Sequence, residues 1–220
     1  MLDDVFIGSL VVTSIVAVAF IIERGLALRW RKVVPPEVEY AVDAFASTAD
    51  LKRLQAVCES NPSALSRLLL VILTHLGSPR AETISALETK ARHEVARLDK
   101  WLVVLEIIVG IAPLLGLTGT VYGLITLFGG LSKNALGDYS QLARGIGLAL
   151  NATLLGLIIA IPSLIAWSYY SKKVETLAVE MESICDEFLR RAYRKSAEAR
   201  LEAEKPAGRI AEAKHASPRI

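Results

Sequence analysis

The feature that most constrains this chain is a run without any charged residue from Ile107 to Ser132. Such a run is long enough to cross a bilayer as a helix, which takes roughly 20 mostly apolar residues. Small residues recur four positions apart along it in two series, Ala112, Gly116, Thr120 and Gly119, Gly123. Small residues at this spacing let another helix backbone approach closely, so the run predicts helix–helix contact rather than a plain lipid anchor.

Two further runs without charge are also long enough to cross a bilayer, from Val5 to Ile22 and from Gly145 to Ser171. Of the 220 residues of the chain, 53% are hydrophobic, which is too apolar for an ordinary soluble domain. The third run has its own series of small residues at three- and four-residue steps, Gly145, Ala149, Thr153, Gly156 and Ala160. These two series predict a homo-oligomer held by the small-residue faces of spans two and three.

Basic residues follow the first run at Arg24, Arg29, Arg31 and Lys32, and Lys172 and Lys173 follow the third. The positive-inside rule places these flanks in the cytoplasm, with the N-terminus outside and the C-terminus inside. A signal peptide is the alternative for the first run. It is disfavoured because no Lys or Arg precedes the run and no convincing cleavage site follows it.

Between the first two runs, the sequence is polar with helical periodicity. The apolar spacing predicts an amphipathic helix that starts near Pro62 or Ser63 and stops at Gly77. A second helix begins after Pro79, and no breaker occurs before Trp101. We therefore expect that helix to continue into the second span as one long rod.

These patterns predict an all-α membrane protein with three transmembrane helices, the second and third extending into a cytoplasmic helical bundle. The expected segments are a periplasmic N-terminus (1–4), helix 1 (5–22), a cytoplasmic helical region (23–100), helix 2 (101–128), a periplasmic turn (129–140), helix 3 (141–171), a cytoplasmic helix (172–195) and a disordered tail (196–220). The short turn makes helices 2 and 3 antiparallel neighbours.

Several function classes are disfavoured. A net charge of +2, without a basic block interleaved with aromatics, does not suggest nucleic-acid binding. The three histidines are scattered, and Cys58 and Cys185 lack metal-knuckle spacing and are expected to be unpaired cytoplasmic thiols. We expect no metal or cofactor, and no nucleophile–base set indicates an enzyme.

Polar side chains at membrane depth are costly, so each is a functional hypothesis. The candidates are Thr118, Thr120, Asn151 and Thr153. A threonine can satisfy its hydroxyl on the preceding turn, whereas an amide needs a partner beyond its own helix. Neither the second nor the third run contains a side chain that exchanges protons near neutral pH. If these helices line a proton path, another chain must supply the titrating group.

The sequence resembles the ExbB/TolQ/MotA family of proton-channel subunits, and the ExbB/TolQ branch in particular. The resemblance covers about residues 5 to 175. It rests on Ala112 to Gly123, on Asn151 to Leu157 followed by Ala160-Ile161-Pro162, and on Glu23-Arg24. The motif positions that serve helix packing are Pro113, Gly116, Gly119, Gly123, Gly156 and Pro162.

The resemblance implies a bacterial inner-membrane subunit forming a pentamer around ExbD/TolR-type single-span proteins, which supply a membrane aspartate. It also implies a TonB/TolA-type energy transducer as a further partner. Thr120 and Thr153 match the threonines that face that aspartate. The family usually has an acidic residue where this chain has Leu148, and Asn151, one turn away, is the candidate to hold water in its place.

The main hypothesis is therefore a stator subunit that, with its partner, forms a proton channel and couples the proton motive force to work on a periplasm-spanning protein. The alternative is a non-conducting membrane scaffold for a single-span partner, which Leu148 makes conceivable. A small-molecule transporter is disfavoured because three spans without inverted repeats offer no broken-helix site.

Overall fold

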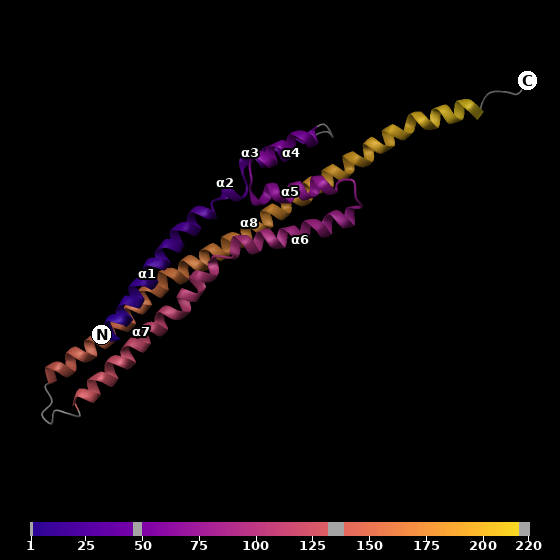
Figure 1. The fold of residues 1–220 in the computed structure, drawn as a ribbon. Coiled ribbons are helices and arrows are strands. Elements are labelled where there is room, and N and C mark those ends of the chain that lie inside the picture. The colour runs from indigo at the N-terminus through magenta and orange to yellow at the C-terminus, as the bar shows by residue number, and fades with distance from the viewer. Residues whose placement is uncertain (1, 46–49, 132–138, 216–220) are drawn as a thin grey trace, which may run out of the picture. The chain divides into compact units, whose positions relative to one another are not determined.

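The computed structural model describes residues 2–45, 50–131 and 139–215 (Figure 1). These residues form the helices α1 (Leu2–Ala27), α2 (Trp30–Val33), α3 (Pro36–Asp43), α4 (Asp50–Ser60), α5 (Ala64–His75), α6 (Arg80–Asp99), α7 (Leu102–Leu131) and α8 (Tyr139–His215). No strand occurs in the described ranges. The predicted all-α class is confirmed.

Three helical segments are long and apolar enough to cross a membrane: Val5–Ala27, Leu102–Gly129 and a stretch of α8 within Gly145–Glu198. Only 11%, 28% and 29% of their most apolar windows are buried. The remaining apolar surface needs lipid or other protein around it. The chain is thus a membrane protein with three candidate spans.

The chain divides into two compact units. The first comprises residues 1–28 and 98–174, and in it α1, α7 and the first part of α8 pack together. The buried apolar core of this unit consists of three alanines and one isoleucine: Ala17, Ala112, Ala160 and Ile108. Such a core lets the helix axes come close because few of its side chains are bulky.

The junction between α6 and α7 corrects one expectation. The predicted continuous rod is wrong, because α6 ends at Asp99 and α7 begins at Leu102. At the break, the guanidinium of Arg24 donates a hydrogen bond of 3.3 Å to the Leu98 carbonyl, a group that the end of α6 leaves free. The Trp101 ring lies 6.0 Å from that of Phe20 on α1. Tertiary contacts thus compensate for the hydrogen bonds lost between the helices.

The second compact unit comprises residues 29–97 and 175–220. The amphipathic helix predicted in it is confirmed as α5, whose start is capped by the Ser63 hydroxyl accepting from the Ser66 amide at 3.1 Å. In α6, the fully buried positions are Thr83 and Glu94. Its apolar residues at three- and four-residue spacing are only half-buried: Ile84, Leu87, Ala91, Val95 and Leu98. The most buried positions of this helix are therefore polar ones, and each has a hydrogen-bond partner on another element.

Those partners come from α5 and from α8. The Thr83 hydroxyl donates to the His75 carbonyl at 2.9 Å and lies 2.7 Å from the Tyr193 hydroxyl. Glu94 accepts a hydrogen bond of 2.6 Å from Arg67. A single sequence carries no periodic signal for such pairs, because each joins residues on different elements.

The C-terminal end of α8 also differs from expectation. The helix continues to His215, where the sequence predicts a tail without secondary structure from residue 196. Alanine, glutamate, lysine and arginine dominate the segment, and all four are strong helix formers. Residues 132–138, most of the predicted periplasmic turn, lie outside the described ranges, so that turn stays a prediction.

Candidate functional site

Close contact between α7 and α8 organises the candidate site. A Cβ atom placed on Gly116 would lie 2.8 Å from the Ala152 carbonyl oxygen, and one placed on Gly156 would lie 2.6 Å from the Ala112 carbonyl oxygen. Real Cβ atoms essentially never come under 3.0 Å, so only glycine fits these positions without movement of a backbone. We call this line of contact the seam.

The seam continues at two more glycines. A Cβ on Gly119 would lie 3.0 Å from that of Ala152, and a Cβ on Gly123 would lie 3.3 Å from that of Ala149. Residue numbers fall along α8 as they rise along α7, so the two helices are antiparallel, as predicted. The small-residue faces that the sequence assigns to a homo-oligomer therefore meet each other within one chain. That assignment is corrected.

The two motif prolines are not part of this contact. Pro113 lies inside α7 without ending the helix and is half-buried, whereas Pro162 is exposed on α8. No atom of either proline is among those nearest to a Cβ placed on a seam glycine.

Helix α1 covers one side of the seam. The Tyr170 hydroxyl of α8 donates to the Ile21 carbonyl of α1 at 2.9 Å. Toward the start of α1, a hollow of about 260 Å³ is lined by residues of all three helices: Phe6, Ile7, Gly119, Gly123, Thr126, Leu127, Gly145, Ala149 and Ala152. Both contacts place α1 against the same side of the α7–α8 pair.

Thr120 lies on the other side of α7. At about 100° per residue, it is about 40° to one side of Gly116, while Gly119 and Ile108 lie about 60° and 80° to the opposite side. Gly119 lines the hollow beside α1, and Ile108 belongs to the core that includes Ala17 of α1. Thr120 is half-buried and turned away from α1.

Thr153 has the matching position on α8. It lies about 60° to one side of Gly156, whereas Tyr170, which bonds α1, lies about 40° to the other. Because the helices are antiparallel, the offsets of Thr120 and Thr153 point the same way. The structure thus brings these two predicted residues to one side of the seam, which we call the open face.

The hydroxyls of the span threonines differ in their partners. Thr120 donates to the Leu117 carbonyl and Thr118 donates to the Leu114 carbonyl, each at 2.7 Å. These bonds satisfy the hydroxyl protons within α7 but leave the oxygen lone pairs free to accept. Within the described part of the chain, the Thr153 hydroxyl has no hydrogen-bond partner. The open face therefore offers acceptors at both threonines.

Asn151 does not join them. It is exposed on α8 and lies about 200° around the helix from Thr153, so it points away from the open face. The side chain of Leu148, where the family usually has an acid, lies outside what the structure describes.

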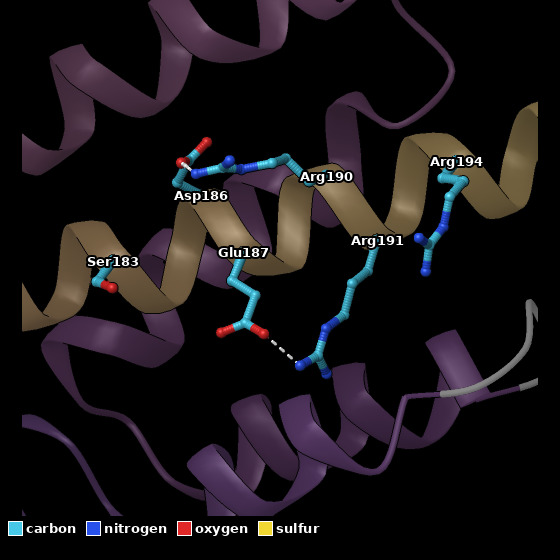
Figure 2. Close-up of a pocket in the computed structure, with 6 residues that line it drawn as sticks. All are labelled: Ser183, Asp186, Glu187, Arg190, Arg191 and Arg194. Carbon is cyan, nitrogen blue, oxygen red and sulfur yellow. Dashed lines mark hydrogen bonds and ion pairs between the residues drawn. The ribbon is translucent and has the colours of Figure 1, made fainter.

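A hollow of about 530 Å³ lies in the second compact unit, on α8 beyond the apolar stretch. Figure 2 shows Arg190 turned toward Asp186 and Arg191 turned toward Glu187, and both pairs are ion-paired. Arg194, the third base of the lining, lies 4.0 Å from Glu198. Because each of the three bases is paired to an acid on its own helix, the hollow has little unpaired charge to offer a ligand. No group of three or more metal-ligating side chains occurs among the described residues.

Comparisons with known proteins show which family this chain is similar to. Residues 60–183 match the MotA/TolQ/ExbB proton channel family. The chain is 36% identical to the ExbB-like 1 biopolymer transport protein of Synechocystis over 72% of this chain and 63% of that protein, just under two thirds of its length. It is 29% identical to the Tol-Pal system protein TolQ of Pseudomonas aeruginosa over 85% of this chain and 86% of that protein.

A third relative is the biopolymer transport protein ExbB of Aquifex aeolicus, 34% identical over 49% of this chain and 72% of that protein. The family match covers more than half of the chain and includes the whole of α7 and the seam on α8. This chain is a member of the MotA/TolQ/ExbB proton channel family.

Proposed function

We propose that this chain is a stator subunit of the bacterial inner membrane. With an ExbD/TolR-type single-span partner, it forms a proton channel that couples the proton motive force to work on a periplasm-spanning protein. The observation that carries this proposal is the open face, where Thr120 and Thr153 meet on the side of the seam that α1 leaves uncovered. A partner helix can lie against that face.

The chemistry of the open face requires that partner. Hydroxyl oxygens accept hydrogen bonds and order water, but they do not exchange protons near neutral pH. From Ile107 to Ser132 and from Gly145 to Ser171 the chain has no acidic or basic side chain. A carboxyl group on the partner would supply the exchangeable proton, with Thr120 and Thr153 accepting from its protonated form or from its water.

The seam supports a rigid wall for such a path. Because Gly116 and Gly156 bring two backbones into contact, the open face can hold its shape while a partner moves against it. One elementary charge crossing 100 mV supplies about 2.3 kcal/mol, so several protons per cycle can drive a conformational step.

Assembly would use surfaces other than the seam. Exposed apolar side chains follow α7 at seven-residue spacing, at Leu114, Val121 and Phe128, and are 61%, 50% and 63% exposed. This row faces away from α8 and is available to lipid or to neighbouring copies. The resemblance to the family supports five copies around a partner dimer, with a TonB/TolA-type transducer as the protein that is moved.

Proton uptake into sealed vesicles tests the proposal. The vesicles would contain this protein together with an ExbD/TolR-type single-span protein, under a potassium-diffusion potential. We expect uptake with both proteins that is absent with either alone, and that is lost when the partner's membrane aspartate is replaced by asparagine.

The alternative, a non-conducting scaffold, is favoured by Leu148 in place of the acidic residue usual in the family. It predicts that the two proteins form a stable complex, seen by native mass spectrometry, while the vesicles take up no protons. That result would contradict the channel proposal and leave the partner contact intact.

A further inference from the structure

One carboxylate shares the open face with the two threonines. Glu106 lies in the first turns of α7, inside the candidate span Leu102–Gly129, and its side chain is exposed. Among the described residues, no cation pairs with it. An exposed, unpaired carboxylate facing lipid is costly, so water or another protein is expected on this side of α7.

The position of Glu106 follows from its spacing. Glu106, Pro113 and Thr120 lie seven residues apart, and a straight helix drifts only about 20° per seven residues. Glu106 therefore lies within about 40° of Thr120 around α7, on the open face. It lies about 21 Å further along the axis, toward the end of α7 that we place in the cytoplasm.

Hydroxyl groups of α8 lie near the same end. Ser171 follows Thr153 by 18 residues, which is about five full turns, so it has the same direction around the helix. Ser168 lies about 60° further around on the open side and is exposed. In the antiparallel seam Ala112 lies opposite Gly156, which places Glu106 beside about residue 162 of α8. Ser168 and Ser171 therefore lie about 9 and 14 Å beyond Glu106 toward the same end of the face.

We propose that Glu106 is a further residue of the proton path, the group that takes up the proton at the cytoplasmic end of the open face. This inference rests on the proposed channel function. A proton leaves the partner's carboxyl group, passes through water along the apolar face and bonds to a Glu106 carboxylate oxygen. That O–H bond then breaks and the proton passes to cytoplasmic water, so each step conserves protons and charge.

The stretch between the two polar ends makes this role specific. The open face of α7 has no titratable side chain between Thr120 and Glu106, and Pro113 and Leu117 lie between them. Water must carry the proton across that interval, and a carboxylate at its end gives the water file a fixed acceptor.

Variants of Glu106 test the inference in vesicles containing both proteins. Glu106→Gln should lower the rate of proton uptake by about tenfold or more, and Glu106→Asp should retain most of it. A double variant, Glu106→Gln with Ile107→Glu, keeps the net charge but moves the carboxylate about 100° around α7. It should not restore uptake. Native mass spectrometry should show the same complex for all three variants.

An infrared measurement on the Glu106→Asp complex gives a second test that does not depend on the glutamine variant folding. A carboxyl band that appears when the proton gradient is imposed should shift relative to the unmodified complex. An unshifted band would overturn the inference, as would unchanged uptake in Glu106→Gln while Thr120→Val lowers it. In both cases the channel proposal stands. If the unmodified complex takes up no protons, both the channel proposal and the role of Glu106 are wrong.

Discussion

A Cβ atom added to Gly116 of α7 would lie 3.0 Å from the Cα of Thr153 in α8. This contact joins a packing position to a candidate pathway position across two helices. The backbone that carries Thr153 is held directly against α7, so the separation of the two open-face threonines depends on the absence of a side chain at Gly116. Packing in the seam and geometry on the open face are therefore linked.

The first prediction concerns the seam glycines. Gly116→Ala and Gly156→Ala should each destabilise the chain by about 1–3 kcal/mol, because the new methyl group meets backbone atoms that cannot turn aside. Gly110→Ala and Gly147→Ala are matched controls in the same two helices, with open space within 4 Å of the added carbon. Thermal unfolding in detergent should show lowered Tm for the first pair only. Equal Tm values for all four variants would contradict the seam.

The sequence predicts much of this fold because its signals are local. The charge-free runs identify three spans, and Ser63 identifies the start of α5. The seam itself shows the limit of such reasoning. The spacing of Gly116 and Gly156 predicts close helix contact, but spacing on one helix does not identify the partner helix. The structure shows that the partner lies within the same chain.

Tertiary polar contacts are the other features that the sequence leaves open. The break between α6 and α7 coincides with the hydrogen bond from Arg24 to the Leu98 carbonyl, between residues 74 positions apart. Helical phase places Thr120 and Thr153 on one side only once Gly116 and Gly156 are known to face each other, and only the position of α1 shows that this side is uncovered. The sequence provides the candidates, and the packing of α1 selects the side.

The second prediction concerns Cys58, which is buried on α4. Burial, and to a lesser degree the neighbouring Glu59 carboxylate, raise the pKa of its thiol to about 11. The reactive thiolate is then scarce at neutral pH, so N-ethylmaleimide should label Cys58 only after unfolding. Ser85→Cys, at an exposed position on α6, is the control and should react rapidly. Mass spectrometry of the labelled protein distinguishes the two.

The same control tests orientation. If residues 23–100 are cytoplasmic, a membrane-impermeant maleimide should label Ser85→Cys only in inside-out vesicles. Labelling in right-side-out vesicles would reverse the proposed topology. The native cysteines do not suit this test, because Cys58 and Cys185 are both buried.

The third prediction concerns Glu94, whose side chain is 3% exposed and pairs with Arg67 and Lys90. Burial favours the neutral acid, but hydrogen bonds from Arg67 and Lys90 outweigh it and lower the pKa of Glu94. A lowered folded-state pKa means that the stability contributed is present above the unfolded value of about 4.3 and is lost as pH falls through the folded value. Glu94→Gln should therefore lower Tm at pH 7, and the gap should close below about pH 4.

Removing the basic partner should be more damaging. Arg67→Met leaves the Glu94 carboxylate buried with fewer partners and should cost about 3–5 kcal/mol. Glu88→Gln, whose exposed carboxylate lies 4.0 Å from Arg92, should stay within about 0.5 kcal/mol. If the Tm difference between Glu94→Gln and the unmodified protein widens as the pH falls, the stated direction of the Glu94 pKa shift is wrong.

The last prediction concerns the open-face threonines. Thr120→Val and Thr153→Val preserve shape and remove an oxygen that can accept from a partner carboxyl or its water, so proton uptake should fall by about tenfold or more while the complex assembles normally. In the unmodified chain the Thr120 proton already bonds the Leu117 carbonyl, so the lost function is acceptance rather than donation. Thr118→Val is the matched control, because its hydroxyl makes a bond of the same 2.7 Å length on the far side of α7. Asn151→Leu should also be mild, since Asn151 is exposed and points away from the open face. Retained uptake in both open-face variants, with loss in Thr118→Val, would place the path half a helical turn away.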